Sequence, residues 1–388
     1  MKTIIIFLAL VFPIISGCGK NGASIPTINP DEINSLQDAI NALPSQGGVI
    51  EIPPGEFKIS KPLIIDKSDV YLRGSGTSTQ IINNNNNHLP AILICSDADS
   101  VNPGSLWRVQ ISDLRIIGNK ESGHGILAKN IQEIYINGIT VTKNGEDGIH
   151  LDRCAENPRV VHCNITYNAE TGLNLIGCHD IVVNSNQFEE NGDALHCFDG
   201  YNLAMSGNNI DDHIKNGVVI ENTYGSVVSG NMIEECDGMA IILDRDCYGI
   251  SIGSNVIAHN GGGVKLEDAH GSSISANTFT INKAHAIYFG PLSDRITVSG
   301  NNFSNSYIGE GKLKRESNDQ KVGGVIINGS RNILFSGNVF AGINSDKAIQ
   351  IELQTSNIFF GNNMLIDNII DPIKLPNSRL INNLVVNE

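Results

Sequence analysis

Three acidic residues recur at an interval of 23 residues in the middle of the chain, and their spacing suits chemistry. Glu221, Asp244 and Glu267 each end a short phrase that reads small, apolar, variable, apolar, acidic. A strand that repeats such a phrase at a fixed period stacks on its own copies, with the apolar positions inside and the variable and acidic positions outside. The sequence therefore predicts that these three acids, called here the acidic column, stand one above another on an outer surface.

Carboxylates stacked in this way could flank a glycosidic bond. Neighbouring strands lie about 4.8 Å apart, and the two acids of a glycosidase are about 5 Å apart in retaining enzymes and roughly 6.5 to 9.5 Å apart in inverting ones. Because three adjacent acids cannot all ionise cheaply, the middle residue, Asp244, is the expected general acid. Glu221 or Glu267 is the expected base or nucleophile, and Asp268 completes the set of catalytic candidates.

Two other interpretations of the acidic column stay open. Outward acids on a repetitive fold are often solvated or paired with basic neighbours, and Arg245 and Lys265 are close in sequence. Stacked carboxylates also suit calcium. The chain contains no Cys-x-x-Cys pair, so we expect no metal centre built from cysteines, and no cofactor unless calcium binds the acids.

The neighbouring outward positions carry groups that suit contacts with a sugar chain. Aligned on the repeated phrase, the variable position reads Leu127, His150, Asn174, His196, Val219, Ile242, Lys265, Tyr288, Ile326 and Gln350. The position that ends the phrase reads Ala128, Asp152, Ile176, Phe198 and then the acidic column. The predicted substrate contacts are His150, Asp152, Arg153, His196, Asp199, Arg245, Lys265 and Tyr288.

Two further sets of residues follow the same period. Just after the acidic position come Tyr201, Tyr224, Tyr248 and then His270. Rings in such a row are expected to stack and stiffen a turn, with sugar stacking as the alternative. Seven cysteines follow Cys18, and because an odd number cannot be fully paired we expect mainly buried thiols, with one disulfide as the alternative.

The period extends far beyond the acidic column. Its clearest marker is asparagine followed by an apolar residue, at Asn164, Asn186, Asn209, Asn231, Asn255, Asn277, Asn302, Asn338 and Asn363. Asparagine suits tight inward turns, where its amide is expected to bond the amide of the neighbouring coil and the backbone. Short strands, 40 glycines and the lack of helical periodicity exclude a helical solenoid. The sequence predicts an all-β, right-handed parallel β-helix over residues 109–388, with the hand that parallel crossovers prefer. An insertion at about 306–322 interrupts it and is expected to protrude, as a loop or as a contact in a homo-oligomer.

The first 108 residues divide into three parts. Residues 1–18 contain Lys2, an apolar run and the end Ile15-Ser16-Gly17-Cys18, and they indicate a secretory signal peptide. That end resembles the lipobox of bacterial lipoproteins. The resemblance implies a lipid on Cys18, a place in the bacterial cell envelope on a membrane face left open, and membrane contact through the lipid alone. Residues 19–30 are the predicted tether, and 31–108 form a cap, with a helix over 30–43, and the first coils.

The charge of the chain limits its partners. A net charge of -15 and a pI near 5.0 argue against nucleic acid, because binding phosphates needs a basic surface. The same charge counts only weakly against an anionic polysaccharide, since a local basic strip or a bound calcium reverses the sign at a site.

The head of the chain resembles a known superfamily. The predicted helix followed by GGVIEIPPGEF and LRGSG resembles the N-terminal head of pectate-lyase-like β-helix proteins, which bind or hydrolyse carbohydrates. That resemblance implies that the helix covers the open end of the coil. The head and the insertion before GGVIINGSRNILFSGNVF also resemble, distantly, the inulin fructotransferases. This likeness implies an Asp and Glu pair among Glu221, Asp244, Glu267 and Asp268.

The signatures of polygalacturonases are not matched. Gly123-His124-Gly125 precedes Asp147-Gly148-Ile149 and Gly192-Asp193-Ala194, although in that family the histidine motif follows the acidic ones. We therefore predict no polygalacturonase site.

The sequence favours an exported carbohydrate-active enzyme that binds an extended poly- or oligosaccharide. Carboxylates from the central repeats would cleave or rearrange a glycosidic bond, as a hydrolase or a fructotransferase does. The first alternative is a uronate lyase or epimerase, with arginine or lysine as the base and calcium on the acids. The second is a carbohydrate-binding surface protein without catalytic activity.

Overall fold

The structure is a computed structural model that describes residues 35–98, 104–305, 322–345, 347–352, 354–368 and 377–386. The predicted signal peptide with Cys18, the tether and nearly all of the predicted insertion lie outside these ranges. Among the described residues, no helix has the length and the apolar character that crossing a membrane requires.

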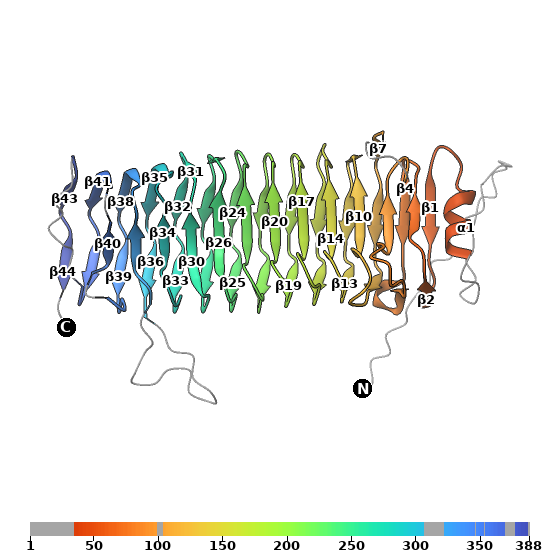
Figure 1. Cartoon of the computed structure of the whole chain (residues 1–388), viewed down its shortest axis with the longest axis horizontal. Helices are drawn as coiled ribbons and strands as arrows, with labels where there is room; N and C mark the ends of the chain where they lie inside the picture. Colours follow the sequence, from red (N-terminus) through yellow and green to blue (C-terminus); the bar gives the residue numbers. More distant parts are fainter. Residues whose placement is uncertain are drawn as a thin grey trace, which may run out of the picture.

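The chain winds into a stack of coils, each of which passes through three parallel sheets in turn (Figure 1). We call these sheets C, A and B, in the order in which a coil visits them.

The described strands of sheet C are β3 (Leu63–Ile65), β6 (Ile92–Ile94), β10 (Ile126–Lys129), β14 (Ile149–Asp152), β17 (Leu173–Ile176), β20 (Leu195–Phe198), β23 (Val218–Glu221), β26 (Met239–Asp244), β30 (Gly262–Leu266), β34 (Ile287–Phe289), β37 (Val325–Ile327) and β40 (Ile349–Ile351). The described strands of sheet A are β1 (Gly48–Glu51), β4 (Val70–Arg73), β8 (Gln110–Ser112), β12 (Tyr135–Asn137), β15 (Arg159–Val161), β18 (Val182–Asn184), β21 (Ala204–Ser206), β24 (Val227–Ser229), β27 (Cys247–Tyr248), β28 (Ser251–Gly253), β31 (Ala269–His270), β32 (Ser273–Ser275), β35 (Asp294–Ser299), β38 (Arg331–Ser336), β41 (Ser356–Gly361) and β43 (Arg379–Ile381).

The described strands of sheet B are β2 (Gly55–Ile59), β5 (Thr79–Asn83), β9 (Arg115–Ile117), β13 (Thr140–Thr142), β16 (Asn164–Thr166), β19 (Gln187–Glu189), β22 (Asn209–Asp211), β25 (Met232–Glu234), β29 (Val256–Ala258), β33 (Thr278–Thr280), β36 (Asn302–Ser304), β39 (Val339–Ala341), β42 (Met364–Ile366) and β44 (Leu384–Val386). A short parallel pair, β7 (Leu106–Trp107) with β11 (Ile131–Gln132), and the 3-10 turn η1 (Gly76–Ser78) complete the described elements apart from α1.

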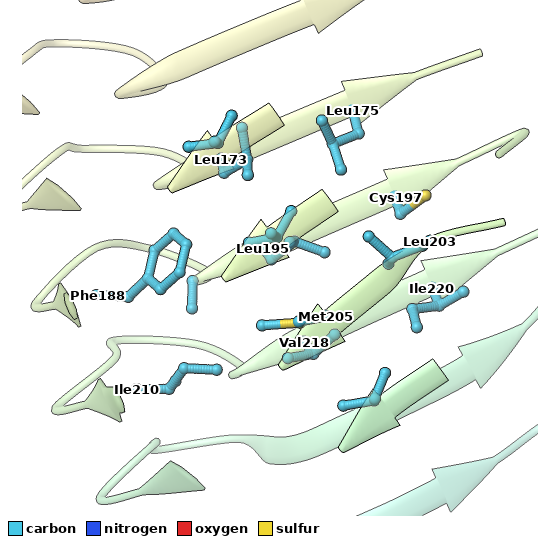
Figure 2. Close-up of a cluster of buried hydrophobic side chains, with 14 of the residues drawn as sticks. Leu173, Leu175, Phe188, Leu195, Cys197, Leu203, Met205, Ile210, Val218 and Ile220 are labelled. Carbon is cyan, nitrogen blue, oxygen red and sulfur yellow. The ribbon is translucent and has the colours of Figure 1, made fainter. Parts of the chain in front are cut away.

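The alternation of apolar and polar residues explains how each coil closes around a core. In β23, Val218 and Ile220 are fully buried, whereas Val219 and Glu221 between and after them are only partly covered. The strand register then places similar side chains one above another, since Val218 pairs with Leu195 of the preceding coil. Figure 2 shows these side chains in rows inside the coil. The period in the sequence thus predicts the fold correctly, because each coil buries its apolar positions against those of its neighbours.

A ladder of buried asparagine side chains fixes the turn between sheets A and B. The Asn255 Oδ1 atom accepts hydrogen bonds from both the backbone N and the Nδ2 of Asn231, each at 3.0 Å. The ladder comprises Asn186, Asn208, Asn231, Asn255, Asn277, Asn301, Asn338, Asn363 and Asn383. Each asparagine side chain thereby bonds the backbone and the side-chain amide of the preceding coil, which confirms the predicted bonding between asparagines of neighbouring coils.

Three of the asparagines that were expected to bond between coils lie one residue away from this ladder. Asn209 and Asn302 begin strands of sheet B and lie outside the ladder, which passes through the preceding residues, Asn208 and Asn301. At Asn164 the preceding residue is Cys163, whose backbone N donates to Asn186. In a pair of adjacent candidates the one that faces inward continues the ladder, and sequence alone does not show which one that is.

The helix α1 (Ser35–Ala42) lies beside β1 at one end of the stack (Figure 1). Leu36 and Ile40 are buried against the core. The side chain of Gln37 bonds both the N and the O of Ile64, the middle residue of β3. The predicted helix is confirmed over its described part, and it covers the end of the coil as the resemblance implies.

The predicted thiols and ring stack are confirmed. Cys95, Cys154, Cys163, Cys178, Cys197, Cys236 and Cys247 are all free and buried. Ring centroids in successive coils are separated by 4.6 Å for His179 and Tyr201, 5.5 Å for Tyr201 and Tyr224, 5.8 Å for Tyr224 and Tyr248, and 4.8 Å for Tyr248 and His270. The rings from Tyr201 to His270 stack face to face, whereas His179 meets Tyr201 edge-on, and the row stiffens the turn between sheets C and A.

Candidate functional site

The outer face of sheet C carries the predicted variable column without a break. Strand register places one above another Leu127, His150, Asn174, His196, Val219, Ile242, Lys265, Tyr288, Ile326 and Gln350. The position that ends each strand is also as predicted from Asp152 to Asp244. Its first member is wrong, because Lys129 and not Ala128 pairs with Asp152; Ala128 faces inward and pairs with Leu151.

Two groups of titratable side chains stand at opposite edges of this face. One lies at the start of the strands, in the turns that enter sheet C, and we call it the histidine site; its members are His124, Glu146, Asp147, His150 and Asn174. The other is the acidic column, at the end of the strands.

A buried carboxylate organises the histidine site. Asp147 is 2% exposed and follows the turn from β13 into β14. Its Oδ2 atom lies 2.8 Å from Nδ1 of His150 and accepts a hydrogen bond of 3.0 Å from Nδ2 of Asn174. Its Oδ1 atom accepts the backbone N–H of Thr171 at 2.9 Å. His150 belongs to the coil of β14, and Thr171 and Asn174 belong to the next turn and coil, so the stacking of adjacent coils builds the site.

The hydrogen bonds assign the protons on both rings. Burial alone would raise the pKa of Asp147, but the hydrogen bonds from His150 and Asn174 and the nearby His124 ring bring that pKa below its usual value. The ionised carboxylate accepts, so His150 donates from Nδ1 and its Nε2 carries a lone pair. The backbone N of Asp147 donates to Nδ1 of His124 at 3.2 Å, so the proton of that ring sits on Nε2, which lies 3.2 Å from Glu146.

The site also separates the proton affinities of its members. Burial lowers the pKa of His124 to about 4, so this ring is neutral near pH 7. Its centroid lies 4.7 Å from that of His150. Burial, followed by the nearby Glu170 carboxylate, raises the pKa of Glu146, in contrast to the adjacent Asp147. Neighbouring acids whose pKa values move apart are typical of sites that transfer protons.

Basic side chains pair with the outer two members of the acidic column, Glu221 and Glu267. Glu221 lies 3.0 Å from Nε2 of His196 and 3.1 Å from Nε of Arg245. Asp244, in register with Glu221, accepts the backbone N–H of Arg245 at 2.7 Å. The guanidinium of Arg245 lies over the ring of Phe198, 5.7 Å from its centroid. The predicted residues therefore come together here, as an ion-paired network.

The last member of the column has its own partners. Glu267 follows Leu266, the last paired residue of β30, and lies 3.4 Å from Nζ of Lys265. That ammonium lies over the ring of Tyr288, 5.8 Å from its centroid, and the hydroxyl of Tyr288 accepts a bond of 2.9 Å from Asn328. The arrangement gives a cation and an aromatic ring side by side on the outer face.

The remaining predicted residues lie at the same edge but apart from the column. Arg153 makes bonds of 2.9 and 3.0 Å to both oxygens of Asp152. Asp199 accepts from the side chain of Asn222 at 2.9 Å. Asp268, a predicted catalytic residue, lies 2.9 Å from Nε2 of His270 and belongs with that ring.

A hollow of ≈ 210 Å³ lies elsewhere, over β12 and β15 of sheet A; its lining residues are Glu133, Ile134, Tyr135, Asn157 and Arg159.

Sequence reasoning missed three members of the histidine site. His124 and Asp147 entered it only as fragments of an unmatched polygalacturonase signature, and Glu146 did not enter it. A usable signal was present, since His124 and Asp147 are 23 residues apart, which is one coil.

Two family models each match part of the chain. A model described as right handed beta helix region matches residues 66–226, and one described as periplasmic copper-binding protein (NosD) matches residues 169–322. A search of curated proteins finds no match. The first match agrees with the observed sheets, and the fold is a right-handed parallel β-helix, as predicted.

Solved structures share the fold at low identity. The mannuronan C-5 epimerase AlgE4 A-module of Azotobacter vinelandii is 18% identical with a TM-score of 0.61, over 84% of this chain and 94% of that one. The catalytic unit of a GH87 alpha-1,3-glucanase from Streptomyces thermodiastaticus is 17% identical with a TM-score of 0.55, over 96% and 70%. DFA-IIIase from Arthrobacter chlorophenolicus A6 is 16% identical with a TM-score of 0.50, over 91% and 87%, which confirms the fructotransferase likeness as one of fold.

Among the described residues, the groups that could hold a metal ion offer nitrogen and oxygen atoms rather than sulfur. Burial raises the pKa of the Cys197 and Cys236 thiols to about 12 and that of Cys247 to about 11, so these thiols stay protonated and make poor ligands. His270 lies among carboxylates within the stretch that the copper-protein model matches. An imidazole with carboxylates suits divalent copper or zinc.

Proposed function

We propose that this right-handed parallel β-helix is a carbohydrate-active enzyme that holds an extended glycan along the outer face of sheet C and transfers a proton through His150. The observation that carries the proposal is the 2.8 Å contact between Nδ1 of His150 and the buried carboxylate of Asp147. A carboxylate in that position fixes the tautomer and the direction of the ring, which leaves Nε2 as an oriented general base.

The substrate class follows from the base. An imidazole can remove the proton on the carbon next to a uronate carboxylate, whereas hydrolysis of a glycosidic bond requires two carboxyl groups that flank it. The histidine site offers one oriented base and one carboxyl group with a raised pKa, Glu146. Arg153, Arg245 and Lys265 line the far edge of the face and would neutralise successive uronate groups.

The reaction can be written with every bond balanced. Nε2 of His150 takes the proton from C-5 of a uronate residue. The electron pair of that bond forms a C4–C5 double bond while the C4–O4 bond breaks, and O4 leaves with the proton of Glu146. If a water molecule instead protonates the C-5 carbanion from the opposite side of the ring, the product is the C-5 epimer, the chain stays intact, and the resulting hydroxide takes the proton from His150.

The comparisons support the substrate class by analogy of fold alone. Proteins of this fold include a mannuronan epimerase and an alpha-1,3-glucanase, both carbohydrate-active enzymes by their names. A fold does not determine chemistry, so the argument rests on the histidine site.

The test is a panel of glycans with the products identified. A form of the mature protein without the lipid-bearing Cys18, residues 19–388, is incubated with polyuronates, neutral glucans and fructans, with and without calcium. We expect unsaturated chain ends or a changed ratio of C-5 epimers from a polyuronate. New reducing ends from a neutral glycan, or a cyclic disaccharide from a fructan, would refute proton transfer at a uronate. Binding of a glycan without any product would refute the proposal that the protein is an enzyme.

A second candidate function rests on the acidic column. Glu221 and Asp244 are paired in register on adjacent strands, the arrangement that we predict for a hydrolase or a fructotransferase. In that function Asp244 donates the proton and Glu221 attacks or activates water. His196 and Arg245 both contact the Glu221 carboxylate and hold it in place, which suits the role of a base or nucleophile.

We also propose that the protein acts in the bacterial cell envelope. The lipobox-like end at Cys18 predicts export and a lipid anchor, and one matching family model is described as periplasmic. Metabolic labelling with a radioactive fatty acid, compared between wild type and Cys18→Ser, tests the anchor. An equal label on both proteins would refute it.

A further inference from the structure

We infer that a divalent transition-metal ion binds between Asp246, Asp268 and His270, at the turn that joins sheet C to sheet A. Two adjacent coils supply the ligands. Asp246 belongs to the coil of β26 and β27, and the other two residues belong to the coil of β30 and β31. The inference does not depend on the proposed function, because it concerns a different group of side chains.

The three ligand atoms converge at distances that suit a metal. Nε2 of His270 lies 2.9 Å from Oδ1 of Asp268 and 3.6 Å from Oδ1 of Asp246, and all three atoms lie within 4.8 Å of one another. In a tetrahedral zinc site with bonds of about 2.0 Å, two ligand atoms are roughly 3.3 Å apart. The observed separations lie on both sides of that value, so an ion fits after small rotations of the side chains.

The Nδ1 atom of His270 already has a carboxylate partner. Nδ1 lies 2.7 Å from Oδ1 of Asp294, which makes the carboxylate–histidine pair that orients metal-binding rings in proteins. If Nδ1 carries the proton, the lone pair on Nε2 faces two carboxylate oxygens. Nε2 and the two oxygens then form a set of three ligand atoms that can share one cation.

The cations nearby are directed at a different carboxylate. Arg295 lies 3.2 Å and Arg331 3.9 Å from the oxygens of Asp294. Within the described residues, the ion pairs of Asp246 and Asp268 go to His270 alone. The group therefore carries an excess of negative charge that a divalent ion would balance.

Each ligand is held in place by a further contact. Oδ2 of Asp268 accepts the backbone N–H of Asp246 at 2.9 Å, and Oδ2 of Asp246 accepts the hydroxyl of Tyr224 at 3.4 Å. The ring of His270 stacks on Tyr248. The oxygen of each carboxylate that faces the ring is thus the one left for an ion.

The two other clusters of possible ligands differ on this point. At the histidine site, Nδ1 of His124 accepts a backbone N–H, and the oxygens of Asp147 are filled by hydrogen-bond donors. The cluster of Asp211, Asp212 and Glu235 contains no imidazole. Of these three groups, only the one at His270 leaves an imidazole nitrogen and two carboxylate oxygens facing one another.

The donor set indicates the class of metal. One imidazole and two carboxylates suit zinc or divalent copper, with at least one position left for water or a ligand oxygen. Calcium, which takes six to eight oxygens, fits poorly. An ion bound here would also clip two coils together beside the acidic column.

The experiment measures metal binding by the mature protein after removal of metals with a chelator. Titration calorimetry with zinc chloride and with copper(II) chloride should each give one equivalent. The electron paramagnetic resonance spectrum of the copper form should show coupling to one imidazole nitrogen. The absence of binding would overturn the inference.

Variants locate the site. We expect His270→Gln and Asp246→Asn to weaken metal binding at least tenfold. Asp246 is exposed, so its variant keeps the test valid if His270→Gln fails to fold. The matched control is Asp180→Asn, an exposed acid at the same edge whose carboxylate bonds Asn202. Metal should raise the Tm of the wild type and of the control but not of Asp246→Asn. Unchanged affinity in Asp246→Asn, or a loss in His150→Gln alone, would refute the assignment.

Discussion

The histidine site and the acidic column lie on the same face of the same sheet, yet their carboxylates are in opposite situations. Asp147 is buried and receives hydrogen bonds from two adjacent coils. Glu221 faces outward and is paired with a half-buried histidine and an exposed arginine. An exposed pair contributes little because water screens it, whereas a buried network holds its members in one arrangement. The repeating strand supplies positions for acids, but burial decides which of them can direct a proton.

The edges of the sheet explain the difference. At the start of the strands, the turn that carries Glu146 and Asp147 folds over the preceding coil and covers His124. At the end of the strands, the chain turns into sheet A, and Arg153 and Arg245 remain exposed there. Proton transfer therefore belongs to the first edge, and the second edge suits contacts along a glycan chain.

The largest expected effect is from His150→Gln. Loss of the base should lower kcat on the polyuronate up to about 10⁴-fold. The initial rate of formation of unsaturated ends or of epimerised residues measures it. Because His150 is only partly buried, the melting temperature should stay close to that of the wild type. Activity within tenfold of the wild type would show that the histidine site takes no part in the reaction.

The next effect is from Asp147→Asn. An amide cannot hold the imidazole in the same tautomer, so we expect kcat to fall on the order of 10³-fold. KM should change little, because Asp147 is buried away from the glycan. A loss confined to KM would contradict its role as the residue that orients His150. The double variant with His150→Gln should be no slower than His150→Gln alone.

The pH dependence of stability should also show the buried site. His124 has a pKa of about 4 when folded and about 6.5 when unfolded, so the unfolded chain binds more protons between these values. The contribution of a neutral His124 is complete above about pH 6.5 and is lost as the pH falls towards 4, by roughly 3 kcal/mol. Urea unfolding at several pH values measures it.

The control for this pH dependence is His124→Gln. The variant should lose less free energy of unfolding than the wild type between pH 7 and pH 4.5. Some slope should remain, since burial also lowers the pKa of His213 and His285 to about 4. An identical slope in both proteins would show that His124 is not the buried neutral ring that the structure describes.

The smallest expected effect is from Asp244→Asn. If the acidic column only contacts substrate, kcat should change less than about threefold, as expected for an exposed polar contact. Product formation from the same polyuronate measures it, with Glu221→Gln as a companion. A fall in kcat of more than about 10²-fold would show that the acidic column, and not the histidine site, performs the chemistry. It would favour the glycosidase mechanism, in which these carboxyls act directly.

The fold and one column of the site were predictable because the period is strong. Val218 and Ile220 predict an inward face, and every residue from Leu127 to Gln350 in the variable column has the partner that its phase predicts. The ladder positions at Asn208 and Asn301 were missed by one residue, since adjacent asparagines give no sign of which one faces inward. A residue at the end of a short strand can likewise shift by one, as Lys129 shows.

The chemistry of the site was less predictable because it depends on contacts between coils. No motif marks Glu146, and Asp268 belongs by phase beside the acidic column although its carboxylate bonds His270. The partners of Asp147 come from residues up to 27 positions away, in the coils before and after it. Such contacts arise only once the turns have taken their paths.

The sequence by itself thus determined the coil, its register and which side chains face outward, because these follow from a repeated pattern that each coil satisfies with its neighbours. Only the tertiary structure decided which outward acids are buried, which ring nitrogen carries a proton and which carboxylates converge on His270. Those properties depend on the loss of water and on distances of a few ångströms between turns, and neither is encoded in the period.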